Sequence, residues 1–104
     1  MDAALRAIAE PHRREIIRLV WSGELSAGAI AERFREVSRP AVSQHLRVLI
    51  GAGLLSERRD GTRRLYRARR DRIQQLRAYL DGFWSDRLGA LKTVAEREAK
   101  RRRS

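Results

Sequence analysis

Apolar residues recur every three or four positions along most of this chain, which is the spacing of amphipathic helices. The clearest case begins after Ser38, a residue that can cap a helix, and has Pro40 in its first turn. Gly51 and Gly53 mark its end, so we predict a helix over about 39–50. One side of this helix carries the apolar residues Val42, Leu46, Leu49 and Ile50. We expect that side to be buried.

The opposite side of the same helix is polar and compact. Gln44 and Arg47 point away from the apolar side, and Ala41 and Ser43 are small enough to allow a close approach to another surface. Glutamine can bond the edge of adenine, and arginine can bond guanine or phosphate, so this side is suited to the major groove of duplex DNA. Taken alone, the pattern is more typical of an ordinary surface helix.

Three helical segments come before this one. We expect the first over 2–9, and a second that opens at Pro11 and ends at the break around Gly23. Leu25 and Ser26 introduce a third. The apolar residues of the third are Ile30, Ala31 and Phe34. The apolar faces of all three should pack beneath the helix that follows Ser38.

An arginine-rich hairpin is predicted next. Asp60 and Gly61 form a turn signal between two extended stretches, 54–59 and 63–68. The arginines of this region are Arg58, Arg59, Arg63, Arg64, Arg67, Arg69, Arg70 and Arg72. Only Asp60 and Asp71 interrupt them, so we interpret the hairpin as a wing whose guanidinium groups contact phosphates beside a groove. The alternative is a charged edge that resists aggregation.

A final long helix can be capped by Asp71, and we expect it to run to about residue 96. Its apolar stripe consists of Ile73, Leu76, Leu80, Phe83, Trp84, Leu88, Leu91 and Val94. A small domain cannot easily cover so long a stripe, so pairing with a second copy is favoured over folding back onto its own core. Residues 97–104 have no apolar face and are predicted to be a flexible basic tail.

Composition favours a polyanionic partner. The 104 residues include 24 lysines and arginines against 13 acidic residues, a formal net charge of +11, which suits nucleic acid. Cysteine is absent, which excludes disulfides and thiolate metal sites. No signal-peptide pattern or long apolar run is found, so we expect a cytoplasmic location. The sequence has no nucleophile motif, phosphate-cradling glycine loop or histidine pair at metal spacing, so we do not expect an enzyme.

Several short motifs together resemble those of one protein family. They are Glu24-Leu25, SRPAVSQHLRVL over 38–49, AGLL over 52–55 and GTRRLY over 61–66. In this combination the chain resembles the ArsR-type winged helix-turn-helix transcriptional regulators, over roughly residues 7–94. The resemblance implies a homodimer, formed by the first and last helices, that binds an inverted-repeat operator and usually represses transcription. It also implies a cytoplasmic protein of a bacterium or an archaeon.

Many members of that family sense metals, but the ligand positions are changed here. Ser26 and Gly28 stand where relatives carry thiolates, and neither is a good ligand for a soft metal. The final helix offers an incomplete set of ligands: Asp71, Asp81, Asp86 and Glu96. We therefore predict no metal site and no cofactor. His45 is expected to pack against the third helix, or alternatively to bond phosphate, and His12 to face solvent.

These observations predict a mainly α (α+β) fold, a winged helix-turn-helix with about five helices and one β-hairpin wing. Residues 1–96 would form the DNA-binding and dimerisation domain, and residues 97–104 the tail. The expected function is sequence-specific, DNA-binding transcriptional regulation by a homodimeric repressor at a palindrome-like operator. The alternatives are an unspecific architectural DNA-binding or RNA-binding protein and a protein-interaction module that uses the Phe83 and Trp84 surface.

Two sets of site residues follow from this prediction. The expected DNA-contacting residues are Ser38, Arg39, Pro40, Ser43, Gln44, His45, Arg47, Arg58, Arg59, Arg63 and Arg64. The expected dimer-interface residues are Leu5, Ile8, Leu76, Leu80, Phe83, Trp84, Leu88 and Leu91. The sequence assigns no small-molecule effector.

Overall fold

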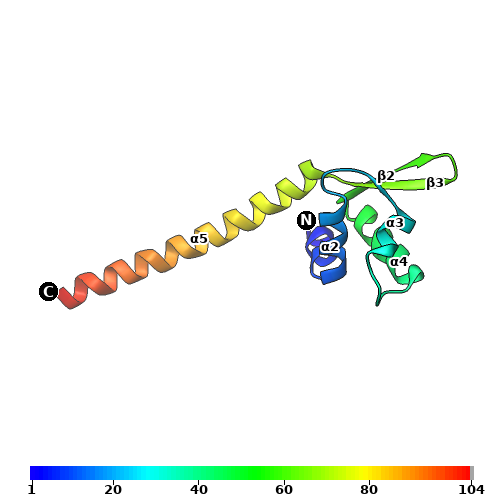
Figure 1. Cartoon of the computed structure of the whole chain (residues 1–104). Coiled ribbons are helices and arrows are strands. Elements are labelled where there is room, and N and C mark those ends of the chain that lie inside the picture. The colour runs from blue at the N-terminus through cyan, green and yellow to red at the C-terminus, as the bar shows by residue number, and fades with distance from the viewer. Residues whose placement is uncertain (104) are drawn as a thin grey trace. The chain divides into compact units, whose positions relative to one another are not determined.

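The computed structural model describes residues 1–103, with side chains at all of these positions except 86–88, 90–93 and 102–103. The elements are α1 (Asp2–Ile8), α2 (Pro11–Leu19), β1 (Leu25–Ser26), α3 (Ala27–Glu32), α4 (Arg39–Gly51), β2 (Leu55–Asp60), β3 (Arg63–Ala68) and α5 (Arg70–Arg103). The chain divides into two compact units, Met1–Gln74 and Gln75–Ser104. The first unit holds every element except most of α5 (Figure 1). The predicted order of helices and hairpin is confirmed.

Three helices of the first unit begin at capping side chains. Ser38 Oγ accepts a hydrogen bond of 3.2 Å from the backbone N–H of Ala41, as predicted, and so satisfies one of the free amides of α4. Ser26 caps α3 in the same way, through a bond of 3.1 Å from the N–H of Ala29. Glu10 caps α2, directly before Pro11. Local side-chain chemistry therefore sets where these helices start.

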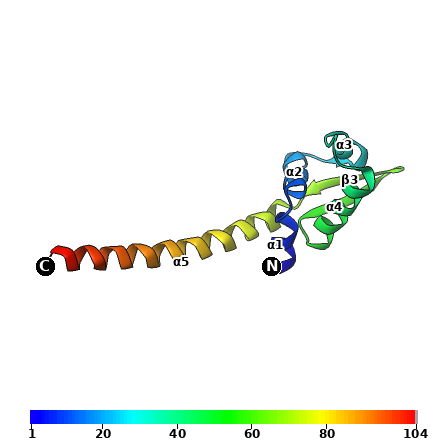
Figure 2. The same ribbon diagram turned by 90° about the horizontal axis from the view of Figure 1, so that it is seen from below.

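The core of the first unit lies beneath α4. Val42, Leu46 and Leu49 are buried, as their spacing predicted, whereas Ile50 is half-buried. Helices α1, α2 and α3 all contact α4 (Figure 2). The other fully buried side chains of the unit include Ile16, Val20, Ile30 and Leu54. Burial of apolar surface on this scale holds α4 in place and leaves its other side for function.

A three-stranded antiparallel sheet with the order β1-β3-β2 completes the unit. Asp60 pairs with Arg63 across the predicted turn, where Gly61 has a φ of 64° that favours glycine. The tip of this hairpin extends past α3 and α4 (Figure 1). Strand β1, which pairs with β3 through Leu25↔Tyr66 and Ser26↔Leu65, was not predicted. Two residues carry no alternating pattern, so this strand exists only because of its long-range partner.

Three predicted positions differ in the structure. Phe34 lies after α3, which ends at Glu32, rather than within that helix. Asp71 lies inside the first turn of α5 rather than at its cap, and its charge there still complements the helix dipole. The helix α5 continues through Arg103 instead of ending near residue 96, because arginine, lysine, alanine and glutamate are good helix formers even without an apolar face. Within the described residues, no helix has the length and apolarity needed to cross a membrane.

Candidate nucleic-acid interface

The outward side of α4 presents the polar residues that the sequence analysis selected. Gln44 and Arg47 are exposed, as are Arg39 and Pro40 in the first turn, and Ser43 is half-buried. The buried residues of α4 pack into the core and hold the helix in place. Its exposed polar side chains therefore form one continuous surface on the opposite side. Ser38 is also exposed, but its hydroxyl is used for the cap of α4.

A groove of about 510 Å³ separates α4 from the hairpin. Its lining includes Ser43 and Arg47 from α4 and Arg64 from β3. Cross-strand pairing places Arg59 opposite Arg64, and the alternation of side chains puts both on one face of the hairpin. Two arginine-bearing elements therefore border the same concave surface, a geometry that suits a phosphate backbone beside a groove.

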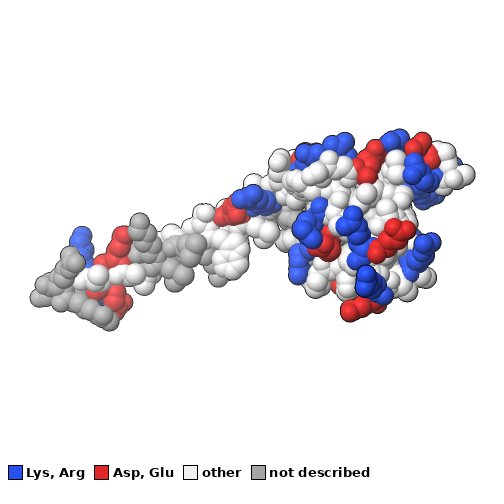
Figure 3. All heavy atoms as spheres, viewed as in Figure 1, with Lys and Arg blue, Asp and Glu red and all other residues white. Residues whose placement is uncertain are grey.

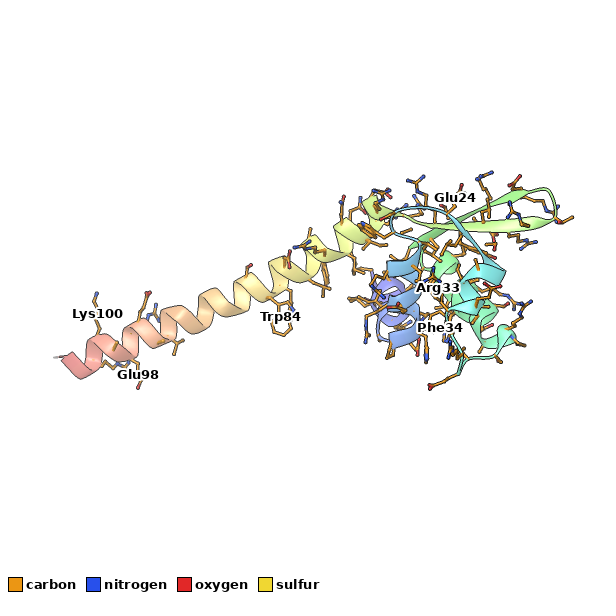
Figure 4. All side chains as sticks on the ribbon, viewed as in Figure 1. Glu24, Arg33, Phe34, Trp84, Glu98 and Lys100 are labelled. Carbon is orange, nitrogen blue, oxygen red and sulfur yellow. The ribbon has the colours of Figure 1, made fainter. Side chains whose placement is uncertain are left out.

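On the opposite face of the hairpin, two arginines pair with carboxylates of the chain itself. Arg58 makes two hydrogen bonds of 2.6 and 2.9 Å with the carboxylate of Glu24, which lies on the loop beside the hairpin (Figure 4). The hydrogen bond from Arg58 holds the pKa of Glu24 below its ordinary value, and the same contact raises the pKa of Arg58. Arg63 also lies on this face and pairs with Asp60 at 3.3 Å.

The hairpin arginines are thus more compensated than predicted. Besides Arg58 and Arg63, Arg64 has a carboxylate within reach, that of Glu57 at 3.9 Å. Two acids besides Asp60 and Asp71 therefore lie beside these arginines, because folding brings Glu24 to Arg58 and strand pairing brings Glu57 to Arg64. Acidic atoms are likewise scattered among the basic ones on the visible surface of the first unit (Figure 3).

His45 does not share the exposed side of α4. Its side chain is 17% exposed, its Nδ1 accepts a hydrogen bond of 3.3 Å from Arg13 Nη1, and its ring stacks on His12 with centroids 5.7 Å apart. The packing partner is therefore α2 and not α3, because the first turn of α2 lies against this flank of α4. His12, expected to face solvent, is 44% exposed, and its ring also donates a hydrogen bond of 2.7 Å to Glu10 Oε1.

The expected dimer residues differ in their exposure. Leu5, Ile8 and Leu80 are half-buried, whereas Phe83 and Trp84 are 46% and 59% exposed. Leu76 is only 3% exposed in a single chain, so it has little surface left for a partner. The side chains of Leu88 and Leu91 lie outside the described residues. Trp84, with Phe83 edge-on at 5.8 Å, projects from α5 (Figure 4).

Comparison with known proteins agrees with this geometry. A family model described as a helix-turn-helix domain matches residues 8–58. The HTH-type transcriptional regulator Rv2034 of Mycobacterium tuberculosis is 45% identical over 81% of this chain and 78% of its own length. The transcriptional repressor SdpR of Bacillus subtilis is 41% identical over 59% of this chain and 67% of its own.

Solved structures extend the likeness to the whole fold. The ArsR-like transcriptional regulator from Rhodococcus sp. RHA1 has a TM-score of 0.75 and 30% identity, over 91% of this chain and 89% of its own. The homodimeric winged helix-turn-helix DNA-binding domain Mb0332 from Mycobacterium bovis has a TM-score of 0.65 and 29% identity, over 84% and 80%. The chain therefore belongs to the ArsR family of winged helix-turn-helix transcriptional regulators.

Proposed function

We propose that this regulator is a homodimeric repressor that recognises an operator with two-fold symmetry through the exposed side of α4. The observation that carries the proposal is the pairing of an unobstructed polar side on α4, including Gln44 and Arg47, with an arginine-bearing hairpin across one groove. Glutamine and arginine at these positions have the chemistry to read adenine and guanine edges. The Mycobacterium bovis relative is a homodimer, and the Bacillus subtilis relative is a repressor, which supports both parts of the proposal.

We propose a role for each of these residues from its exposure and its contacts. Arg39, Ser43, Gln44 and Arg47 would enter the major groove, and Arg59 and Arg64 would contact the backbone. Arg58 is held by Glu24, and His45 by the first turn of α2, so we assign both to positioning rather than to contact with DNA. In a two-fold dimer the α4 helices would enter successive major grooves about 34 Å apart, which predicts a palindrome-like site.

The rest of the proposal concerns the whole chain. Residues 1–96 would form the DNA-binding and dimerisation domain, and the basic residues 97–104 a tail near phosphates. The family consists of DNA-binding regulators, so we propose no catalytic activity. A transcriptional regulator must reach the chromosomal DNA that it binds. We therefore propose a cytoplasmic location.

The test is a double substitution on the exposed side of α4. Each bidentate base contact contributes roughly 1–3 kcal/mol of discrimination, so Gln44→Ala with Arg47→Ala should lower operator affinity by on the order of a hundredfold or more. Affinity for random duplex should fall far less. The measurement is titration of both DNAs by fluorescence anisotropy, with the operator taken from selection of bound genomic fragments.

A matched control removes the same residue types elsewhere. Gln75 on α5 and Arg18 on α2 are both exposed, so Gln75→Ala with Arg18→Ala should leave the discrimination intact. Normal discrimination by the α4 double variant would show that α4 does not read the bases. Equal binding of the original protein to operator, random duplex and structured RNA would favour an unspecific basic protein instead.

A further inference from the structure

Two histidines and a glutamate meet where the first turn of α2 lies against α4. Glu10, His12 and His45 each offer one ligand atom, and these atoms all lie within 4.8 Å of one another. His12 Nδ1 is 2.7 Å from Glu10 Oε1, and His45 Nδ1 is 3.9 Å from Glu10 Oε2. These three residues are named here the α2–α4 cluster. Among the described residues it is the only such group.

The spacing within the cluster suits a tetrahedral metal ion. Zinc binds imidazole nitrogen and carboxylate oxygen at about 2.0–2.2 Å, so two ligands of one ion are roughly 3.3 Å apart. His12 Nδ1 lies 2.7 Å from one Glu10 oxygen and His45 Nδ1 lies 3.9 Å from the other, so both rings border the same carboxylate, and the three ligand atoms need to draw together from at most 4.8 Å. The rings of His12 and His45 are near-parallel, inclined by 19° with centroids 5.7 Å apart, so both imidazoles lie on the same side of α4. Three protein ligands would leave a fourth position for water.

The protonation states are also favourable. Burial alone would raise the pKa of Glu10, but hydrogen bonds from the His12 ring and from the backbone N–H of Arg13 lower it below its ordinary value. Glu10 is therefore ionised at neutral pH and ready to bind a cation. A neutral imidazole can carry its proton on either nitrogen, so a metal at Nδ1 of His12 would leave that proton on Nε2.

The positive charge of Arg13 lies beside the cluster, repels a metal cation and so lowers the affinity of the site for it. Its Nη1 donates to His45 Nδ1 at 3.3 Å, and a metal would have to replace this bond. The rest of the guanidinium stays anchored, because Nε donates to the carbonyl of Ala7 at 2.7 Å. Access to the cluster is open, since the His12 side chain is 44% exposed and lines a hollow of about 300 Å³ with Phe34 and Glu36.

We propose that the α2–α4 cluster is a binding site for a divalent transition metal of the zinc, cobalt and nickel group. Imidazole and carboxylate ligands without thiolate are suited to these ions. The site is distinct from Ser26 and Gly28, the two positions of this chain that the family resemblance would assign to metal ligands. A bound ion would join the first turn of α2 to α4 and so stabilise the folded first unit. Metal binding as proposed does not depend on the proposed DNA-binding function.

The test is titration of chelator-treated protein, without a histidine tag, with Co²⁺ and Zn²⁺. Co²⁺ should produce a visible ligand-field absorption band, and Zn²⁺ should raise the melting temperature and shift the imidazole nitrogen signals of both His12 and His45. His12→Asn removes one ligand and should weaken Co²⁺ binding by about tenfold or more, since even outer-shell changes cost that much. Binding should also weaken in acid, because protons compete with the metal for the ligand atoms.

The matched control is Glu36→Gln, which removes a carboxylate from the same hollow but not from the cluster. It should bind Co²⁺ with unchanged affinity. The proposal is overturned if the original protein gives no Co²⁺ band, if His12→Asn binds as tightly, or if Zn²⁺ leaves the His45 ring signals unmoved. The ring signals are read in the original protein, so they remain decisive even if a variant fails to fold. Operator binding by metal-free protein tests the DNA-binding function separately.

Discussion

At the scale of single residues, serine hydroxyls decide where two helices of the first unit begin. The Oγ atom of Ser26 accepts a hydrogen bond from the backbone N–H of Ala29 and so caps α3. Ser38 does the same for α4. The same residue type thus satisfies one free backbone amide in the first turn of each helix.

Ser38→Ala should destabilise the protein by about 1 kcal/mol, because the N–H of Ala41 loses its acceptor at the start of α4. Denaturant unfolding followed by circular dichroism measures this change. Ser22→Ala, at an exposed position after α2, is the control and should have little effect. Equal stability of the two variants would mean that the Ser38 cap contributes nothing measurable.

The ion pair between Glu24 and Arg58 links the loop before β1 to the hairpin, and it should make stability depend on acid. Because hydrogen bonding to Arg58 lowers the folded-state pKa of Glu24 below 4.5, this contribution is present above that pH. It is lost as the pH falls through the lowered pKa. Stability should therefore decline in acid partly through this one carboxylate.

Glu24→Gln should melt at a lower temperature than the original protein near pH 7, and the gap should close towards about pH 3. Melting curves across this range measure the effect. Glu32→Gln, exposed at the end of α3, provides the comparison and should show no such closing gap. If the difference in melting temperature between Glu24→Gln and the original protein stayed constant with pH, the ion pair between Glu24 and Arg58 would not contribute to stability.

At the scale of elements, the hairpin has two faces with different roles. One face carries Arg59 and Arg64, of which Arg64 lines the groove beside α4 and lies 3.9 Å from Glu57. The other face carries Arg58 and Arg63, which pair more closely with Glu24 and Asp60. A strand alternates its side chains, so arginines one position apart point to opposite faces. Under the proposed function, arginines that are neighbours in the sequence would therefore differ in their contact with DNA.

Arg64→Ala should weaken binding to operator and random duplex alike and reduce the dependence of affinity on salt by about one phosphate contact. Arg63→Ala removes the same charge from the next residue but from the opposite face, and should leave the salt slope nearly unchanged. Titrations at several salt concentrations compare the two. If Arg63→Ala reduced the slope as much, the proposed division of the hairpin into faces would be wrong.

At the scale of the whole molecule, α5 has an exposed apolar surface that is suited to an interface with another protein chain. Tyr79, Phe83 and Trp84 are all about half exposed, and large aromatic side chains gain much from burial in an interface. A second copy of this chain is the partner that the proposed function requires. Two-fold symmetry of the protein would then match the symmetry of the operator.

Trp84→Glu should weaken the dimer by on the order of tenfold or more, because aromatic anchors dominate interface energetics and a carboxylate resists burial. Sedimentation velocity over a range of concentrations measures the association. Ser85→Glu adds the same charge about 100° around the helix, away from the apolar stripe, and should leave the dimer intact. An unaffected Trp84→Glu dimer would place the interface elsewhere, and an original protein that is monomeric would favour a protein-interaction surface.

The sequence by itself determined the features that depend on neighbours within a few positions. The span of α4, its Ser38 cap, its buried residues such as Leu49 and the turn at Gly61 all follow from hydrogen bonds and side-chain spacing inside one element. The exposed side of α4 follows as well, because a helix with one side buried must present the other. These are local consequences of helix and turn geometry.

Only the tertiary structure decided which distant groups meet. Strand β1 needs β3 some forty residues later, Glu24 needs Arg58, and His12 and His45 come together only when α2 packs against α4. No spacing rule predicts such contacts, because they depend on how whole elements pack and not on the period of any one element. The division of the hairpin arginines and the α2–α4 cluster therefore became visible only in the folded chain.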